Sequence, residues 1–427
     1  MRQPSCLFWI PVLLLCLGLM NSSIEAAQQS PLPFDLETGW ERDDFEPLFI
    51  MNRVQDYSFG ATWKLLNEES YYPNLKISTL YSTGTKVWYP GIYAEQPFIS
   101  SGLLNLWVDY GKEAQPFGFD DHILTRAENT AAAFFIREDF MDYVEVRRVA
   151  GGLRIGPFAD QSLSLGMTSE RHRSMNRVTQ LSGLFGGHKV FPPNAMASEM
   201  EPILLKARYD WRIPGGWTPW SREVWNNRDS GLWMTWEGWW AHPDLGGKMN
   251  LSRHLVEGRF HLALNRFVKL RARAAVGWTP HGNREGFGFP IYPGREGTLV
   301  AEPGGDSFLT GPGRVPPQWT FHAGGIGTLR GHDEKEFVGD QLLLANLEYA
   351  IRPERSFEIY LFTDLGKAWY QDSAPYAGEG FFGKGQLEWD GGLGVEMANG
   401  GVRVQMGQNL RDMDKDPRFT LRLQRAF

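Results

Sequence analysis

The chain of 427 residues carries 43 basic and 50 acidic residues, and its formal net charge of −7 argues against a nucleic-acid-binding surface. Beyond the N-terminal segment, no stretch approaches the ~20 apolar residues that a membrane-spanning helix needs, and the mean hydropathy is −0.35. These features argue against a helical membrane protein. They allow a membrane β-barrel, because its strands face lipid with only every second residue.

Residues 1–27 have the pattern of a secretory signal peptide. Arg2 supplies a positive charge, residues 7–20 form an apolar core, and Ala26 and Ala27 offer a cleavage point. An uncleaved anchor is the alternative, because the residues just before the cleavage point are not small.

The only two cysteines, Cys6 and Cys16, lie inside this leader, so the mature chain is expected to contain no disulfide. The polar, proline-containing start of residues 28–48 indicates a short periplasmic lead-in. Residues 49–427 are then expected to form a single barrel domain.

Alternation of apolar and polar residues begins near Asn52. In residues 57–65, Phe59 and Trp63 fall on one face and Ser58 and Thr62 on the other, as in a half-buried strand. The same period of two predicts further strands at residues 75–82, 86–98, 103–110, 143–158, 162–172, 203–211, 232–241, 253–265, 267–278, 341–351, 357–369, 386–397, 401–407 and 418–427.

A closed bacterial barrel has an even number of strands, which asks for one more strand before Tyr57. Residues 45–53 are the candidate, giving sixteen strands. Fourteen strands, obtained by merging segments near Thr83, is the alternative.

Residues 120–139 break the alternation. Ile123, Ala127, Ala131 and Phe134 recur at three- and four-residue steps, which predicts one short amphipathic helix. The helix is expected on the barrel rim or in a loop. A gating or substrate-contacting helix is the alternative.

Alternation alone does not separate a membrane barrel from a soluble sandwich, which also has one apolar face. The secretory leader and the last strand, which ends in Phe427, favour an outer-membrane barrel in which the apolar face meets lipid. Tryptophans near strand ends also favour the barrel, as interfacial anchors. They are Trp88, Trp211, Trp278, Trp369 and Trp389.

Carboxylates recur on the inward face of the strands that follow Arg330. The alternation places Glu348, Glu358, Asp364, Asp390 and Glu396 on that face, together with Asn346 and Glu388. An arginine that reaches the interior could form a bidentate pair with such a group. In the plainer alternative, the carboxylates line water and Arg330 is an ordinary loop residue.

The C-terminal half also carries a set of motifs. Leu329-Arg-Gly-His332 is followed by Leu347-Glu-Tyr349, Phe362-Thr-Asp-Leu-Gly366, Gly392-Leu-Gly394 and a terminal Phe427. Over residues 320–427 this set resembles the BamA/TamA-like (bacterial surface antigen) outer-membrane barrels.

The resemblance implies an extracellular loop that folds into the lumen, with Arg330 at its tip, Asp364 as first partner and Asp390 as second. His332 departs from the aromatic residue usual in that family. We call Arg330, Gly331 and His332, with Asp364, Asp390 and Glu348, the lumen lock.

The resemblance further implies a role in protein or lipid transfer or assembly at the bacterial outer membrane. Members of that family with assembly or translocation roles carry periplasmic POTRA domains, and residues 28–48 are too few for one. The expected partners are therefore outer-membrane lipids and a separate periplasmic protein. A passive pore or structural surface protein is the alternative.

Enzymatic chemistry finds little support in the sequence. The nine histidines show no metal-site spacing, so neither a metal nor another cofactor is expected. Gly324 to Gly327 is not followed by a helical pattern, as a nucleotide loop would be. An outer-membrane hydrolase is the second alternative, and His261, beside Glu257 and Arg259, is its only candidate residue.

Overall fold

Sixteen strands of the chain pair in sequence order to form one antiparallel sheet. The computed structural model describes residues 45–65, 73–99, 103–158, 160–179, 189–214, 230–247, 249–265, 267–281, 315–354, 357–370, 387–397 and 401–423. The strands are β1 (Phe45–Asn52), β2 (Asp56–Leu65), β3 (Asn74–Ser82), β4 (Val87–Pro97), β5 (Leu104–Pro116), β6 (Tyr143–Phe158), β7 (Gln161–Ser174), β8 (Ile203–Pro214), β9 (Gly231–Ala241), β10 (Leu251–Ala263), β11 (Val268–His281), β14 (Gln341–Glu354), β15 (Phe357–Trp369), β16 (Glu388–Met397), β17 (Val402–Asn409) and β18 (Arg418–Arg422).

The predicted all-β architecture is confirmed, and the described residues form sixteen strands of one large antiparallel sheet rather than fourteen. The additional strand that an even strand number required is β1. The sheet therefore begins at Phe45, within the segment expected to be a lead-in. The side chain of Asn52 accepts hydrogen bonds from the backbone N–H groups of Val54 and Gln55, which fixes the tight β1–β2 turn. The leader, most of the lead-in and Phe427 lie outside the described residues.

Side chains are sorted between the two faces of the sheet as a membrane barrel requires. On β14, Leu347 and Tyr349 are each 43% exposed, whereas Glu348 between them is fully buried. On β2, Phe59 is 53% exposed and the neighbouring Ser58 is buried. A sandwich would bury the apolar face and expose the polar one, so this inverted arrangement separates the two interpretations.

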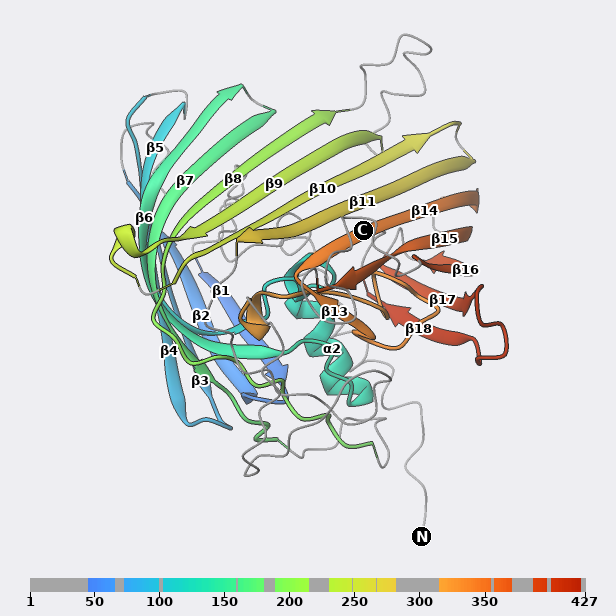
Figure 1. Ribbon diagram of the computed structural model, residues 1–427, viewed down its shortest axis with the longest axis horizontal. Coiled ribbons are helices and arrows are strands. Elements are labelled where there is room, and N and C mark those ends of the chain that lie inside the picture. Colours follow the sequence, from blue (N-terminus) through green and yellow to red (C-terminus); the bar gives the residue numbers. More distant parts are fainter. Residues whose placement is uncertain are drawn as a thin grey trace.

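The interior of the curved sheet holds α2 (Arg126–Ile136) and β13 (Phe337–Gly339), as Figure 1 shows. The predicted helix at residues 120–139 is shorter than expected. Thr125 caps its first turn by accepting a hydrogen bond from the backbone N–H of Glu128, and Arg137 ends it in a left-handed conformation. The preceding Asp120–His122 forms a separate 3₁₀ turn.

Residues 315–340 are the described part of the connection between β11 and β14, and most of them are buried inside the sheet. We call them the inserted loop. The loop contains a short 3₁₀ turn (Pro317–Trp319) and a two-stranded sheet of β12 (Phe321–Ala323) and β13. Its Phe321 and Leu329 pack with Phe119 and with apolar residues of β14.

Among the described residues, no helix is both long enough and apolar enough to cross a membrane.

Candidate functional site: the lumen lock

Arg330 lies against the inner wall of the sheet and binds Asp364 of β15 in a bidentate pair. Its Nε donates to Asp364 Oδ2 at 2.8 Å and its Nη2 to Oδ1 at 2.6 Å. The backbone N–H of Arg330 also donates to Oδ2, at 3.2 Å. Both side chains are almost fully buried, so this charge-assisted pair fixes the position and the orientation of the loop tip.

The second carboxylate on Arg330 comes from β14. Arg330 Nη1 donates to Glu348 Oε1 at 2.6 Å, and the guanidinium lies 3.6 Å from the ring centre of Phe362. Asp390, the second partner expected from the family resemblance, does not bind the Arg330 side chain, and that expectation is wrong. The two carboxylates on Arg330 belong to Asp364 and Glu348.

Asp390 of β16 instead holds the next residue of the tip. Its Oδ2 accepts a hydrogen bond from the backbone N–H of Gly331 at 2.6 Å. A Cβ atom at Gly331 would lie 2.5 Å from the backbone nitrogen of Asn409, at the end of β17. Glycine is therefore required here, because any side chain would push the tip away from the wall.

His332 forms an ion pair where the related family has an aromatic residue. Its Nδ1 lies 2.9 Å from Asp390 Oδ1, as an ion pair rather than a well-aligned hydrogen bond, and its Nε2 lies 3.6 Å from Glu388. Its ring also meets Phe337 edge-on, with 5.3 Å between centres. Burial alone would lower the pKa of His332, but Asp390 and Glu388 outweigh burial and raise that pKa to about 9.

We expect the pH dependence of stability to report on this pair. Because the pKa of His332 is raised in the folded state, its stabilisation is complete below pH ~6.5, the pKa of a free histidine. It is lost as the pH rises through about 9. In urea unfolding, His332→Gln should be destabilised relative to wild type at pH 6 and match it above pH 9. A difference that does not change with pH would contradict the ion pair, and the exposed His242→Gln serves as control.

A wider ionic network, which the sequence did not reveal, surrounds the lock. Glu348 also accepts from Arg403 Nη2 at 2.8 Å and from Arg271 Nη1 at 3.3 Å. Arg271 in turn binds Glu396 at 3.0 Å and Glu358. The inward alternation of β11 and β17 was the available signal for these arginines. Their partners depend on which strands face each other across the lumen, which a single sequence does not specify.

A second ionic cluster anchors the inserted loop beyond its tip. Lys335 donates to Asp120 at 2.9 Å and to Asp142 at 2.7 Å, and His322 Nε2 lies 2.7 Å from Asp120 Oδ1. Burial alone would raise the pKa of Asp142, but Lys335 and Arg53 hold it below its usual range. The loop is thus tied directly to the β5–β6 connection and, through the pair of Asp142 with Arg53, to the β1–β2 turn.

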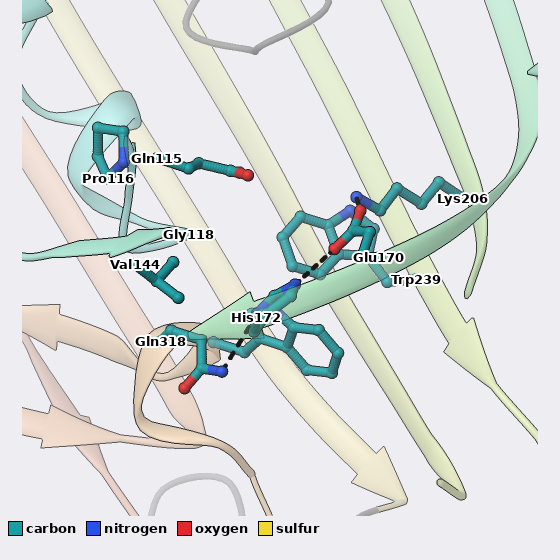
Figure 2. A pocket seen from close by; sticks show the side chains of 10 residues that line it. Gln115, Pro116, Gly118, Val144, Glu170, His172, Lys206, Trp239 and Gln318 are labelled. Carbon is teal, nitrogen blue, oxygen red and sulfur yellow. Dashed lines mark hydrogen bonds and ion pairs between the residues drawn. The ribbon is translucent and has the colours of Figure 1, made fainter. Parts of the chain in front are cut away.

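The base of the inserted loop meets the wall in a polar joint. Figure 2 shows Glu170 between His172 and Lys206, with Gln318 of the inserted loop on the other side of the histidine ring. His172 Nε2 lies 2.8 Å from Glu170, and Lys206 donates to Glu170 at 2.6 Å. The adjoining cavity is about 10 Å³, room for about one water molecule. The joint therefore holds the loop and has no space for a substrate.

Other chemistry is not assembled in the described part of the chain. No group of three or more His, Cys, Asp or Glu side chains there could hold a metal ion. The ring of His261 packs edge-on against Trp233, with 5.1 Å between centres. Glu257, its expected neighbour, is bound to Arg259 and Arg273. These contacts give His261 the role of a packed lumen residue.

Comparison with known proteins agrees with this architecture. Residues 137–423 match the sequence model of the Omp85 superfamily domain. The solved structure of BamA from Haemophilus ducreyi lacking POTRA domains 1–3 is 13% identical, with a TM-score of 0.54 over 90% of this chain and 70% of that chain.

Two further structures have lower scores. CdiB from Acinetobacter baumannii has 11% identity and a TM-score of 0.40, over 86% of this chain and 56% of that chain. CdiB from Escherichia coli has 11% identity and a TM-score of 0.42, over 95% and 69%. No curated protein matches the chain. Because the superfamily match covers more than half of the sequence, the chain belongs to the Omp85 superfamily, as an outer-membrane barrel of assembly and transport rather than an enzyme.

Proposed function

We propose that this barrel acts in the transfer or assembly of protein or lipid at the outer membrane while its own lumen is held closed by the inserted loop. The observation that carries the proposal is the burial of Arg330 between Asp364 and Glu348. The charge of Arg330 keeps the loop inside the barrel, because withdrawal of the loop would deprive the buried carboxylates on the wall of this cation.

The filled lumen distinguishes this role from that of a passive pore. A pore needs a continuous wet channel, whereas most of residues 315–340 lie buried inside the sheet. Polar groups of the loop are paired with the wall at the tip and at the polar joint, where Gln318 contacts His172 of β7. We therefore assign client contact to the barrel wall and its edges rather than to a central channel.

We infer that a separate periplasmic protein delivers the client to this barrel. The described residues belong to the barrel, to its connections and to the elements inside it, and none of them forms a POTRA domain. The periplasmic partner is the one expected from the family resemblance, and its delivery of the client is part of this proposal.

The proposal is tested by depleting the protein in its native bacterium. We expect folded levels of other outer-membrane barrels, or the amounts of surface lipids, to fall before growth stops. Wild-type protein should restore them, and Arg330→Ala should restore them incompletely. Unchanged levels of both classes after depletion would contradict the proposal, and co-purification with a periplasmic protein would identify the partner.

Single-channel recording separates the proposed role from a passive pore. In planar bilayers we expect wild-type protein to give small, flickering conductance, because the inserted loop blocks the lumen. Arg330→Ala should increase both the size and the duration of openings, since it frees the tip. Glu354→Gln, at the exposed end of β14, is the matched control. A large, steady wild-type conductance would favour the pore.

A further inference from the structure

The two ends of the sheet are linked by a helix. Pairing runs without interruption from β1 to β18, and in the described residues no ladder joins β18 back to β1. An edge strand leaves backbone N–H and C=O groups without partners, which is costly where water is excluded. Some of these edge groups are instead bonded to side chains of α2.

The last strand is held through Glu128 of α2. Glu128 Oε1 accepts a hydrogen bond from the backbone N–H of Leu423, directly after β18, at 2.9 Å. The same carboxylate pairs with Arg422 at 3.2 Å, and both side chains are buried. Arg422 also donates to the backbone oxygen of Ile123, just before α2, at 2.8 Å.

The first strand is held through the next part of the same helix. Thr130 Oγ1 accepts from the backbone N–H of Met51 in β1 at 3.4 Å. Phe134 meets Phe49 of β1 edge-on, with 6.3 Å between ring centres. Met51 also packs in a small core with Ala133 of α2. The contacts to β1 and to β18 thus come from residues on a single helix.

We propose that α2 is a strap across the seam between β1 and β18, and that it holds both strand edges in place through separate contacts. Glu128 and Thr130 lie two residues apart and take backbone N–H groups from opposite ends of the sheet. Each side chain accepts a hydrogen bond from a backbone N–H group that would otherwise bond to the carbonyl oxygen of a neighbouring strand. Release of either contact leaves a strand edge with an unpaired donor.

The helix is suited to this role because tertiary contacts hold it in place. α2 has 11 residues, and a helix shorter than roughly 12 residues is marginal on its own in water. Its position therefore depends on the contacts with the two edges and with neighbouring loops. A small loss of contact free energy at one edge should free that edge without unfolding the other strands.

The strap is tested by hydrogen exchange of the full chain folded in lipid nanodiscs. Thr130→Val removes the hydroxyl with little change of shape, and should accelerate exchange in residues 45–52 on the order of tenfold. Glu128→Ala should do the same for residues 418–423. Glu128→Gln keeps an acceptor for Leu423 but loses the charge on Arg422, and should have an intermediate effect.

Two controls make the result specific. Arg126→Gln removes a contact between α2 and Glu113 of β5, and should leave both edges unchanged. Peptides from β6 and β7 should exchange at the wild-type rate in every variant. Unchanged exchange at both edges, or equal acceleration throughout the sheet, would overturn the proposal. The readout needs no client, so it is independent of the transfer function proposed above.

Discussion

Replacing Arg330 with alanine is expected to destabilise the folded barrel by about 3 to 5 kcal/mol, the usual cost of removing one partner of a buried ion pair. The substitution leaves Asp364 buried on the wall without the guanidinium that binds both of its oxygens, and it removes one of the three arginines that pair with Glu348. It also removes the cation over the Phe362 ring. The loss should appear as a lower urea midpoint and as faster hydrogen exchange in residues 315–340.

Arg330→Lys is the informative companion variant. Lysine keeps the positive charge but does not form the two parallel hydrogen bonds that arginine forms with a carboxylate. It should recover part of the stability, and exchange in the inserted loop should fall between that of wild type and that of Arg330→Ala. If Arg330→Ala costs less than about 1 kcal/mol, the value typical of an exposed pair, then Arg330 does not lock the loop.

The strands were predictable because each carries its pattern locally. The period of two located fifteen of the sixteen strands, as with Phe59 and Trp63 facing outward on β2. The remaining strand, β1, was expected only because a closed barrel has an even number of strands. The two short strands β12 and β13 were missed. Each has only three residues, all of them apolar, small or aromatic apart from His322. Such segments show no alternation, and their pairing depends on burial inside the barrel.

The lock was predictable in part. Alternation alone placed Glu348, Asp364 and Asp390 on the inward face, and the motif at residues 329–332 indicated Arg330 as the tip. Which atoms of the loop tip each of these carboxylates binds was not predictable. Asp364 and Asp390 are directly opposed on β15 and β16, but Arg330 binds Asp364 and Glu348 of β14, whereas Asp390 binds the backbone of Gly331. Alternation gives the face of a residue and leaves open which neighbouring strand a loop approaches.

His332 shows a different limit. The sequence indicated only that an aromatic residue was missing from the tip, which weakened the match with the related family. The structure shows that the imidazole keeps a ring contact with Phe337 and adds an ion pair with Asp390. Histidine in place of the usual aromatic residue therefore replaces part of an apolar contact with an ion pair of a titratable group, whose pH dependence is described above.

Glu348 connects the lock to the rest of the lumen. Three arginines from different segments converge on its carboxylate: Arg330 of the inserted loop, Arg271 of β11 and Arg403 of β17. Removing one arginine leaves two partners for this carboxylate. Removing the carboxylate leaves three cations close together, so this glutamate is the more sensitive position in the network.

We therefore expect Glu348→Gln to destabilise the barrel by at least as much as Arg330→Ala, about 3 to 5 kcal/mol. Glutamine preserves the shape and an acceptor oxygen, so the loss isolates the charge. The effect should extend beyond the loop, with faster exchange in β11 and β17 as well as in residues 315–340. Glu354→Gln makes the same change at the exposed end of the same strand and should change stability by less than about 0.5 kcal/mol. Equal effects of the two substitutions would show that the buried carboxylate does not organise the lumen charges.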